Sequence, residues 1–278
     1  MKIKKYSGEL VEYDVSKLRN SLSKSGASPQ AVEHIVAAIQ PRLFDGIHTK
    51  DLYRMAFNYL KQRSSSLAAR YSLKRALADL GPDGYFFEKW AARIFKHMGY
   101  QTVSGEHLTG HAVRHEIDIV GLKDGALMIA ECKFRNTTEA KISVTTPMYF
   151  LSRFKDLEGK RFEYFGTAAI ISASWLVTNA YLTKDAIAFS EYYQINVLSW
   201  DYPEGKNIKN RVDNAGLYPL TCLTSLNKTE KRTLLEAGCV LVKDLLANPD
   251  TLAELRLTAS KERKVREEAE ALVNYTAV

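Results

Sequence analysis

The sequence predicts a multidomain protein of mixed α+β and α/β class, and three features of the chain predict it. A Gly81-Pro82 pair follows a predicted helix and marks a boundary. Helices and strands alternate from residue 82 to 212, which is typical of helices covering a central sheet. Only helices are predicted after that. We therefore expect domains at residues 1–81, 82–212 and 213–278: a helical bundle with a β-hairpin, an αβ core, and a small all-α region.

Composition is that of an ordinary globular chain, with 46% hydrophobic and 26% charged residues. No apolar run approaches the roughly 18 residues of a membrane-spanning helix, and the basic N-terminus lacks the apolar core of a signal peptide. Cys132, Cys222 and Cys239 are odd in number and have no metal-ligand spacing, which indicates free thiols. We therefore expect a cytoplasmic protein that does not bind membranes.

The N-terminal segment begins with a predicted hairpin turning at Ser7-Gly8, followed by four helices. Predicted helix starts, each a capping residue, are Asp14, Ser28, Thr49 and Ser66. The whole formal net charge of +7 lies here, because residues 1–81 hold 14 Lys and Arg against 7 Asp and Glu, while the rest of the chain balances. This excess suits an anionic ligand, nucleotide or nucleic acid, or equally a solvated basic surface.

The middle segment opens with an amphipathic helix at residues 85–98 and continues with a hairpin around residues 123–125. Further elements are a helix at 149–157, a strand at 166–172, a helix at 184–193 capped by Thr183, and a strand at 195–200.

Charged residues interrupt this otherwise apolar hairpin. Period-two alternation places Glu131 and Lys133 on one face, and pairing around the turn brings Asp118 beside them. One interpretation is a half-exposed hairpin with a surface salt bridge between Glu131 and Lys133. The other is a cation site, because two carboxylates in a partly buried sheet repel each other and a divalent cation removes the repulsion.

Asp118 followed by Glu131-Cys132-Lys133 resembles the PD-(D/E)xK signature of restriction-endonuclease-like nucleases. The preceding helix, which begins after Gly84, carries Glu88 and ends at Gly99-Tyr100, is similar to the Mrr branch of that superfamily. The resemblance covers roughly residues 84–200 and implies a phosphodiesterase acting on DNA.

This resemblance assigns a role to each matching residue. Asp118, Glu131 and the carbonyl of Cys132 would hold Mg²⁺ or Mn²⁺, and Lys133 would position water and stabilise negative charge. Glu88 would reach the metal directly or through water.

The chain departs from the Mrr pattern, which has Gly-x-Asp and then Gln-x-Lys. Here Glu116 shares a face with Asp118 and is either an additional ligand or a strand-edge charge, whereas His115 faces the other way as a structural histidine. Four nearby side chains are DNA-phosphate contacts or ordinary helix-surface groups: Arg135, Asn136, Tyr149 and Arg153.

Residues 1–81 resemble the ATP-cone, a regulatory nucleotide-binding domain. The matching positions are Ile3, Lys5, Gly8, Tyr13, Asp14, Lys17 and Leu18. The resemblance implies that Lys5 and Lys17 contact the phosphates of ATP or dATP. Tyr6 and Ser7 replace the Arg and Asp or Asn usual in the family, so the alternative is a cone that serves docking or dimerisation.

The C-terminal helices resemble helix-hairpin-helix repeats, with Gly238 alone left of the glycine-rich turn. A protein-interaction or dimerisation helix pair is the alternative. The combined expectation is a Mg²⁺-dependent DNA endonuclease gated by ATP or dATP and acting as a homo-oligomer. The competing hypotheses are a catalytically silent nucleotide- and DNA-binding regulator and an accessory subunit of a defence or repair complex.

Overall fold

The computed structural model describes residues 1–5 and 7–274 and separates into two compact units. One unit joins the described residues of 1–73 with those of 220–278, and the other comprises residues 74–219. Both contain helices, and both contain strands, in agreement with a multidomain protein of mixed α/β class. Among the described residues, no helix is long and apolar enough to cross a lipid bilayer.

The first unit begins with the expected hairpin, formed by β1 (Lys2–Lys4) and β2 (Leu10–Glu12). A short third strand, β3 (Ile47–His48), pairs in parallel with β1 and makes a sheet of order β2-β1-β3. The helices that follow the hairpin in this unit are α1 (Val15–Ser23), α2 (Pro29–Ile39) with η1 (Gln40–Arg42), α3 (Thr49–Arg63) and α4 (Ser65–Tyr71). The next helix, α5 (Leu73–Ala78), belongs to the second unit from residue 74 onward.

Local hydrogen bonds explain where these helices begin. Asp14 accepts from the N–H of Ser16 and Ser28 from that of Ala31, as their capping roles predict. The third helix starts after His48, with Thr49 as its first residue. The prediction of one continuous fourth helix is wrong: α4 is capped by Ser64 and ends at Tyr71, and α5 is a separate helix that begins at Leu73.

The remaining part of the first unit is wholly helical in its described residues, as expected. Its elements are η2 (Leu220–Cys222), α10 (Lys228–Glu236), α11 (Val242–Ala247), η3 (Pro249–Leu255) and α12 (Ala259–Val273). Glu268 of α12 is buried, and its two carboxylate oxygens accept from the N–H and hydroxyl groups of Thr224 and Ser225 at 2.5–2.9 Å. These hydrogen bonds hold the loop between η2 and α10, which contains Thr224 and Ser225, against α12.

The second unit is built on a mixed sheet of order β11-β9-β6-β5-β4. Its strands are β4 (Gln101–Thr109), β5 (Arg114–Lys123), β6 (Ala126–Cys132), β9 (Thr167–Val177) and β11 (Asn196–Leu198), with β8 (Arg161–Tyr164) pairing with the start of β9. β4, β5 and β6 are antiparallel, whereas β6, β9 and β11 run parallel. The parallel connections contain the helices α7 (Thr145–Leu157) and α8 (Lys184–Tyr192).

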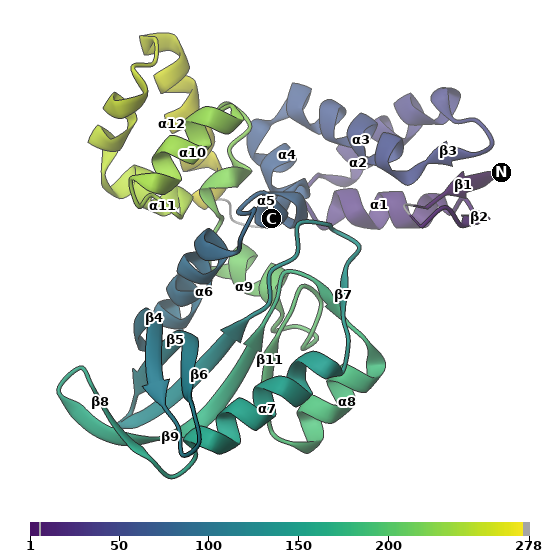
Figure 1. Cartoon of the computed structure of the whole chain (residues 1–278). Helices are drawn as coiled ribbons and strands as arrows, with labels where there is room; N and C mark the ends of the chain where they lie inside the picture. Colours follow the sequence, from purple (N-terminus) through teal and green to yellow (C-terminus); the bar gives the residue numbers. More distant parts are fainter. Residues whose placement is uncertain (6, 275–278) are drawn as a thin grey trace. The chain divides into compact units, whose positions relative to one another are not determined.

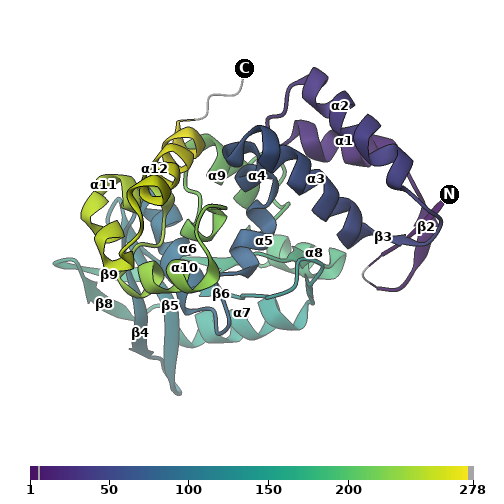
Figure 2. The ribbon, with the colours of Figure 1, turned by 90° about the horizontal axis from the view of Figure 1, so that it is seen from above.

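Helices lie on both faces of this sheet. Figures 1 and 2 show α7 and α8 side by side, and the two helices share a core with the apolar residues of β5, β6 and β9. The helix α6 (Tyr85–His97) packs against β4, β5 and β6, and Phe95 meets the Trp175 ring of β9 edge-on. The helix α9 (Ile208–Ala215) follows β11 and ends at Gly216.

A second, two-stranded parallel sheet ties two loops together near the ends of β6 and β9. It consists of β7 (Lys141–Ile142) and β10 (Tyr181–Leu182). The structure separates into two compact units, and the expected division into three domains at residues 1–81, 82–212 and 213–278 remains a prediction. All three cysteines are buried free thiols, as expected.

Candidate active site

Two neighbouring strands carry the acidic residues of the hairpin. In the register of β5 and β6, Ile119 pairs with Ala130, so Asp118 and Glu131 are the next residues beyond the last paired positions. The ladder gives way there to a side-chain contact: the N–H of Cys132 donates to Oδ2 of Asp118 at 2.6 Å. This bond orients the Asp118 carboxylate at the end of β6.

The first turn of α6 contributes Glu88. The turn before it is tightly packed, since a Cβ on Gly84 (φ +97°) would lie 3.3 Å from Cβ of Phe134 and 3.7 Å from Oε1 of Glu88. The Phe87 and Phe134 rings are 5.7 Å apart, which joins α6 to the segment after β6. Glycine is required at position 84 because an L side chain rarely adopts this backbone conformation and would also crowd Phe134.

These acids perturb one another. Burial, and then the charges of Asp118, Glu116 and Glu131, raise the pKa of Glu88 to about 7. Burial and the charge of Glu131 raise the pKa of Asp118 to about 6, although the Cys132 N–H and Arg153 act in the opposite direction. Both carboxyl groups therefore hold protons more tightly than in water, chiefly because they are buried and additionally because the neighbouring acids repel them.

One cation does reach the cluster. Nη1 of Arg153, from α7, lies 2.7 Å from Oε2 of Glu131, and both side chains are largely buried, at 14% and 13% exposure. The same nitrogen donates to the carbonyl of Glu116 at 2.9 Å. Nε of Arg153 is buried without a hydrogen-bond partner among the described residues. The sequence left Arg153 as either a DNA-phosphate contact or a helix-surface group, and the structure pairs it with Glu131.

Lys133 lies directly after β6, and its backbone is held from both sides. Its N–H donates to the carbonyl of Val177 at 2.7 Å, and its own carbonyl accepts from the Thr178 hydroxyl at 2.6 Å. In the part of the chain that the structure describes, the Lys133 ammonium has no hydrogen-bond or ion-pair partner. Its partly buried side chain is therefore available to an anion.

Asn179 positions the next turn of chain. Its Oδ1 accepts from the N–H of Arg135 at 2.8 Å, and its Nδ2 donates to the carbonyl of the same residue at 2.6 Å. Sequence reasoning missed both Thr178 and Asn179. The sequence did contain a clue, because two polar residues directly follow the apolar strand β9. In the structure both side chains are buried.

The neighbours of Asp118 on β5 differ in role. Nε2 of His115 lies 2.7 Å from Oδ2 of Asp156, so His115 is a hydrogen-bonded structural residue, as expected. Asp156 also accepts from the N–H groups of Ala112 and Val113, and these contacts lower the pKa of Asp156 to about 2. Glu116 is exposed at the strand edge, from where its charge raises the pKa values of Glu88 and Asp118.

A test of fit to a divalent cation rests on these side chains. Within residues 1–5 and 7–274, no three His, Cys, Asp or Glu side chains come together as a preformed metal cage. Mg²⁺, however, is usually bound by one or two carboxylates, together with waters and substrate phosphates. Asp118 and Glu131 supply hard oxygen donors with excess negative charge, so the residues present fit Mg²⁺ or Mn²⁺.

The lysines expected to contact nucleotide lie in the first unit. Nζ of Lys5 makes an exposed ion pair with Glu9 at 2.9 Å across the hairpin turn. Lys17 is exposed on α1, where its charge contributes to lowering the pKa of Asp14. Tyr6, which replaces a family arginine, lies outside the described residues.

Comparison with known families supports one of the three resemblances. Residues 1–80 match the ATP cone domain, which confirms that resemblance and supports nucleotide binding. Residues 218–273 match the family described as AF1548-like, C-terminal. This match does not identify helix-hairpin-helix repeats.

Similar proteins cover most of the chain. A protein of Archaeoglobus fulgidus described as uncharacterized is 31% identical over 183 residues, which make up 66% of this chain and 99% of the relative. The crystal structure of AF1548, a protein of unknown function, has 30% identity and a TM-score of 0.55, and covers 68% of this chain and 97% of that one. The MspJI restriction endonuclease, solved with a 27-mer oligonucleotide, has 14% identity and a TM-score of 0.32 over 48% of this chain and 29% of its own.

Proposed function

The chain belongs to the AF1548-like family, and we propose that it is a metal-dependent DNA endonuclease regulated by nucleotide at its ATP cone. The observation that carries the catalytic part is the cluster at the end of β6. There Asp118 and Glu88 have raised pKa values, Glu131 completes the acidic set, and Lys133 offers an unpaired ammonium. Metal-dependent hydrolysis of a phosphodiester uses such a combination: acids that bind the metal ion and an ammonium that stabilises charge on the phosphate.

Asp118, Glu131 and the carbonyl of Cys132 would hold Mg²⁺ or Mn²⁺. When bound, such a cation lowers the pKa of coordinated water and neutralises charge on the phosphate. Burying two like charges costs free energy in the protein alone, so this cost favours cation binding.

The chain's own residues account for the remaining steps. Glu88, with a pKa of about 7, is able to accept a proton from the attacking water near neutral pH. As the water oxygen bonds to phosphorus, the opposite P–O bond breaks and the leaving oxygen takes up a proton from solvent, to which Glu88 later returns the proton that it accepted. Lys133 donates hydrogen bonds to a phosphate oxygen and stabilises the charge that develops on it.

Regulation is the role proposed for the first unit. Lys5 and Lys17 would contact the phosphates of ATP or dATP, with Lys5 leaving its exposed pair with Glu9, a pair of small energetic worth. Nucleotide binding would change the cleavage rate or the number of subunits in a homo-oligomer. The C-terminal helices would contribute DNA or subunit contacts, as the helix-hairpin-helix resemblance implies.

A catalytically silent regulator or accessory subunit is the second candidate, and the Arg153–Glu131 ion pair favours it. That pair supplies one acid with a protein cation at 2.7 Å. In this alternative the site would bind DNA without cleaving it.

Cleavage of supercoiled and linear DNA separates the candidates. Assays would contain Mg²⁺ or Mn²⁺, with and without ATP or dATP, and measure the loss of intact DNA by gel electrophoresis. We expect cation-dependent cleavage that Asp118→Ala and Lys133→Ala abolish and that Lys184→Ala, on an exposed position of α8, preserves. Cleavage that persists in both site variants would reject the site, and DNA binding without cleavage would favour the regulator. A rate and oligomer size indifferent to both nucleotides would reject regulation by the cone.

A further inference from the structure

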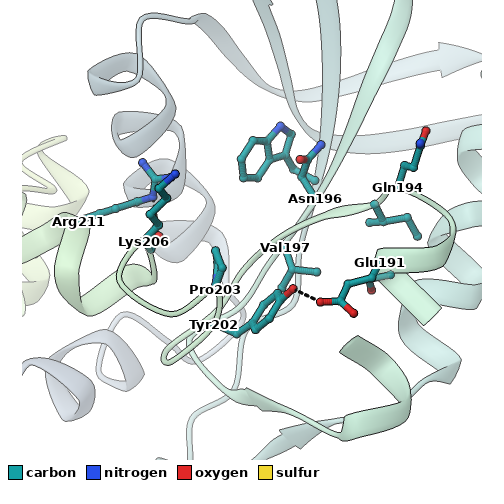
Figure 3. Close-up of a pocket in the computed structure, with 11 residues that line it drawn as sticks. Glu191, Gln194, Asn196, Val197, Tyr202, Pro203, Lys206 and Arg211 are labelled. Atoms are coloured by element: carbon teal, nitrogen blue, oxygen red, sulfur yellow. Dashed lines mark hydrogen bonds between the residues drawn. The ribbon is translucent and has the colours of Figure 1, made fainter. Parts of the chain in front are cut away.

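A second concave site lies in the second unit, at the β11 edge of the main sheet (Figure 3). It has a volume of about 420 Å³ and is formed by the end of α8, β9, β11 and the loop leading to α9. None of its lining residues belongs to the candidate active site. Trp175 pairs with Ala130, the residue before Glu131, so the Trp175 and Glu131 side chains point to opposite faces of the sheet.

One end of the pocket is cationic. Arg211 is partly buried on α9, and its Nε donates to the carbonyl of Lys206 at 2.9 Å, which places the two residues side by side. No described carboxylate pairs with the Arg211 guanidinium, and burial alone lowers its pKa. A desolvated guanidinium with unused donors is a ready partner for a phosphate, to which it binds through two parallel hydrogen bonds.

The opposite end offers a ring and amides. The Tyr202 hydroxyl donates to Oε1 of Glu191 at 2.7 Å, which fixes the ring in the lining of the pocket (Figure 3). Nδ2 of Asn196 donates to the carbonyl of Ser174 at 3.2 Å, so its Oδ1 remains as an acceptor. Gln194 brings a second, exposed amide.

This set of groups has a recognisable chemistry. Aromatic side chains stack on planar rings such as nucleobases, and amide groups form hydrogen bonds with the edge of a heterocycle. Arginine and lysine neutralise the charge of a phosphate. The volume is within the range of roughly 300–1,000 Å³ typical of small-ligand pockets. Glu191 is already engaged by Tyr202 and lies away from the cations, so it does not cancel their charge.

We propose that this pocket binds a nucleoside phosphate, with the base at Trp175, Asn196 and Tyr202 and the phosphate at Lys206 and Arg211. The nucleotide would be either free in solution or extruded from a DNA strand, since both present the same base and phosphate. The proposal stands on the pocket alone and does not require nuclease activity. None of the pocket residues belongs to the ATP cone, which matches residues 1–80.

Isothermal titration calorimetry on the full chain in EDTA tests the free-nucleotide source. The probes are AMP, dAMP, dCMP, adenosine and inorganic phosphate. We expect the monophosphates to bind more tightly than adenosine or phosphate, and Arg211→Gln and Lys206→Gln each to weaken that binding about tenfold or more. Lys206 is exposed, so its substitution does not disturb packing.

Two further variants locate the binding. Arg161→Gln, an exposed arginine of β8, should leave monophosphate affinity unchanged, and Lys17→Gln reports any monophosphate that binds at the cone instead. Affinity that falls with Lys17→Gln but not with the two pocket variants would assign the binding to the cone and overturn the proposal. Equal affinity for inorganic phosphate would overturn the role of the base.

A duplex carrying 2-aminopurine at one position tests the extruded source. Its fluorescence should rise when the wild-type chain binds in EDTA, and the rise should be lost in Arg211→Gln and kept in Arg161→Gln. This result supports the pocket even where free monophosphates do not bind. If neither monophosphate binding nor the fluorescence change depends on Arg211 and Lys206, the proposal is wrong.

Discussion

Replacing Asp118 with asparagine should stabilise the second unit at neutral and alkaline pH. Burial and the Glu131 charge raise the pKa of Asp118 from 3.8 to about 6. The folded protein therefore binds this proton more tightly than the unfolded chain, so the free energy of unfolding falls as pH rises through the window between these two values. The loss is complete above pH 6 and amounts to about 3 kcal/mol at most.

Asparagine carries no charge to desolvate, and its Oδ1 still accepts from the N–H of Cys132. In EDTA, we expect Asp118→Asn to raise the free energy of unfolding by about 1–3 kcal/mol at pH 8. Near pH 4.5 the difference should be clearly smaller than at pH 8, because Asp118 is then protonated in the folded wild-type protein and only its unfolded form has largely ionised. The pH dependence of the difference separates this electrostatic effect from any change in packing.

Tryptophan fluorescence during urea unfolding suits the measurement, because Trp90, Trp175 and Trp200, the only three tryptophans, all lie in residues 74–219. The signal therefore reports on the second unit. Asp156→Asn is a control of opposite sign: contacts with Ala112, His115 and Val113 lower the pKa of Asp156, so its charge adds stability above pH 4. A variant Asp118→Asn that is less stable than wild type at pH 8, or equally shifted at pH 4.5 and pH 8, would refute the reasoning.

Two other substitutions probe the candidate site and the first unit. Arg153→Gln should bind Mn²⁺ several-fold more tightly in calorimetry, because Arg153 occupies an oxygen of Glu131 and adds a like charge; weaker Mn²⁺ binding would mean that Arg153 supports the cation instead of competing with it. Glu268→Gln should lower the free energy of unfolding of the first unit by about 1–3 kcal/mol, since an amide NH₂ would face donors from Thr224 or Ser225. Thermal unfolding of Glu268→Gln followed by circular dichroism measures this effect, and Glu262→Gln, a change on the surface of the same helix α12, is the control. Equal melting temperatures of the two variants would contradict the role of Glu268.

Local features were predictable from the sequence because they depend on residues close together in the chain. The capping roles of Asp14, Ser28 and Thr183 follow from hydrogen bonds to N–H groups two or three residues away. The hairpin from β5 to β6 follows from alternation and a Lys-Asp-Gly turn, and it places Asp118 near Glu131. The ATP-cone resemblance rested on a similarly local pattern and is confirmed.

The predictions from sequence were wrong where the final structure depends on contacts beyond the local helical or strand propensity. Residues 66–80 have a continuous helical pattern, yet the chain breaks at Ser72 into α4 and α5. The side chain of Ser72 donates to the carbonyl of Ala69, one of the local alternatives to helix that serine offers. The strand β3 was also missed, because two residues carry too little periodicity to be recognised without their partner β1.

The sequence by itself determined the helix caps, the hairpin and the spacing of Asp118, Glu131 and Lys133, because each depends on short-range hydrogen bonds or strand alternation. Only the tertiary structure decided that Arg153 pairs with Glu131 from 22 residues away and that Asn179 holds Arg135 from 44 residues away. Neither contact has a local signal, since each depends on how a helix or a parallel strand packs after the chain has crossed over. The charge balance of the candidate site is therefore set by the tertiary structure, whereas the residue types that make up the site could be identified from the sequence.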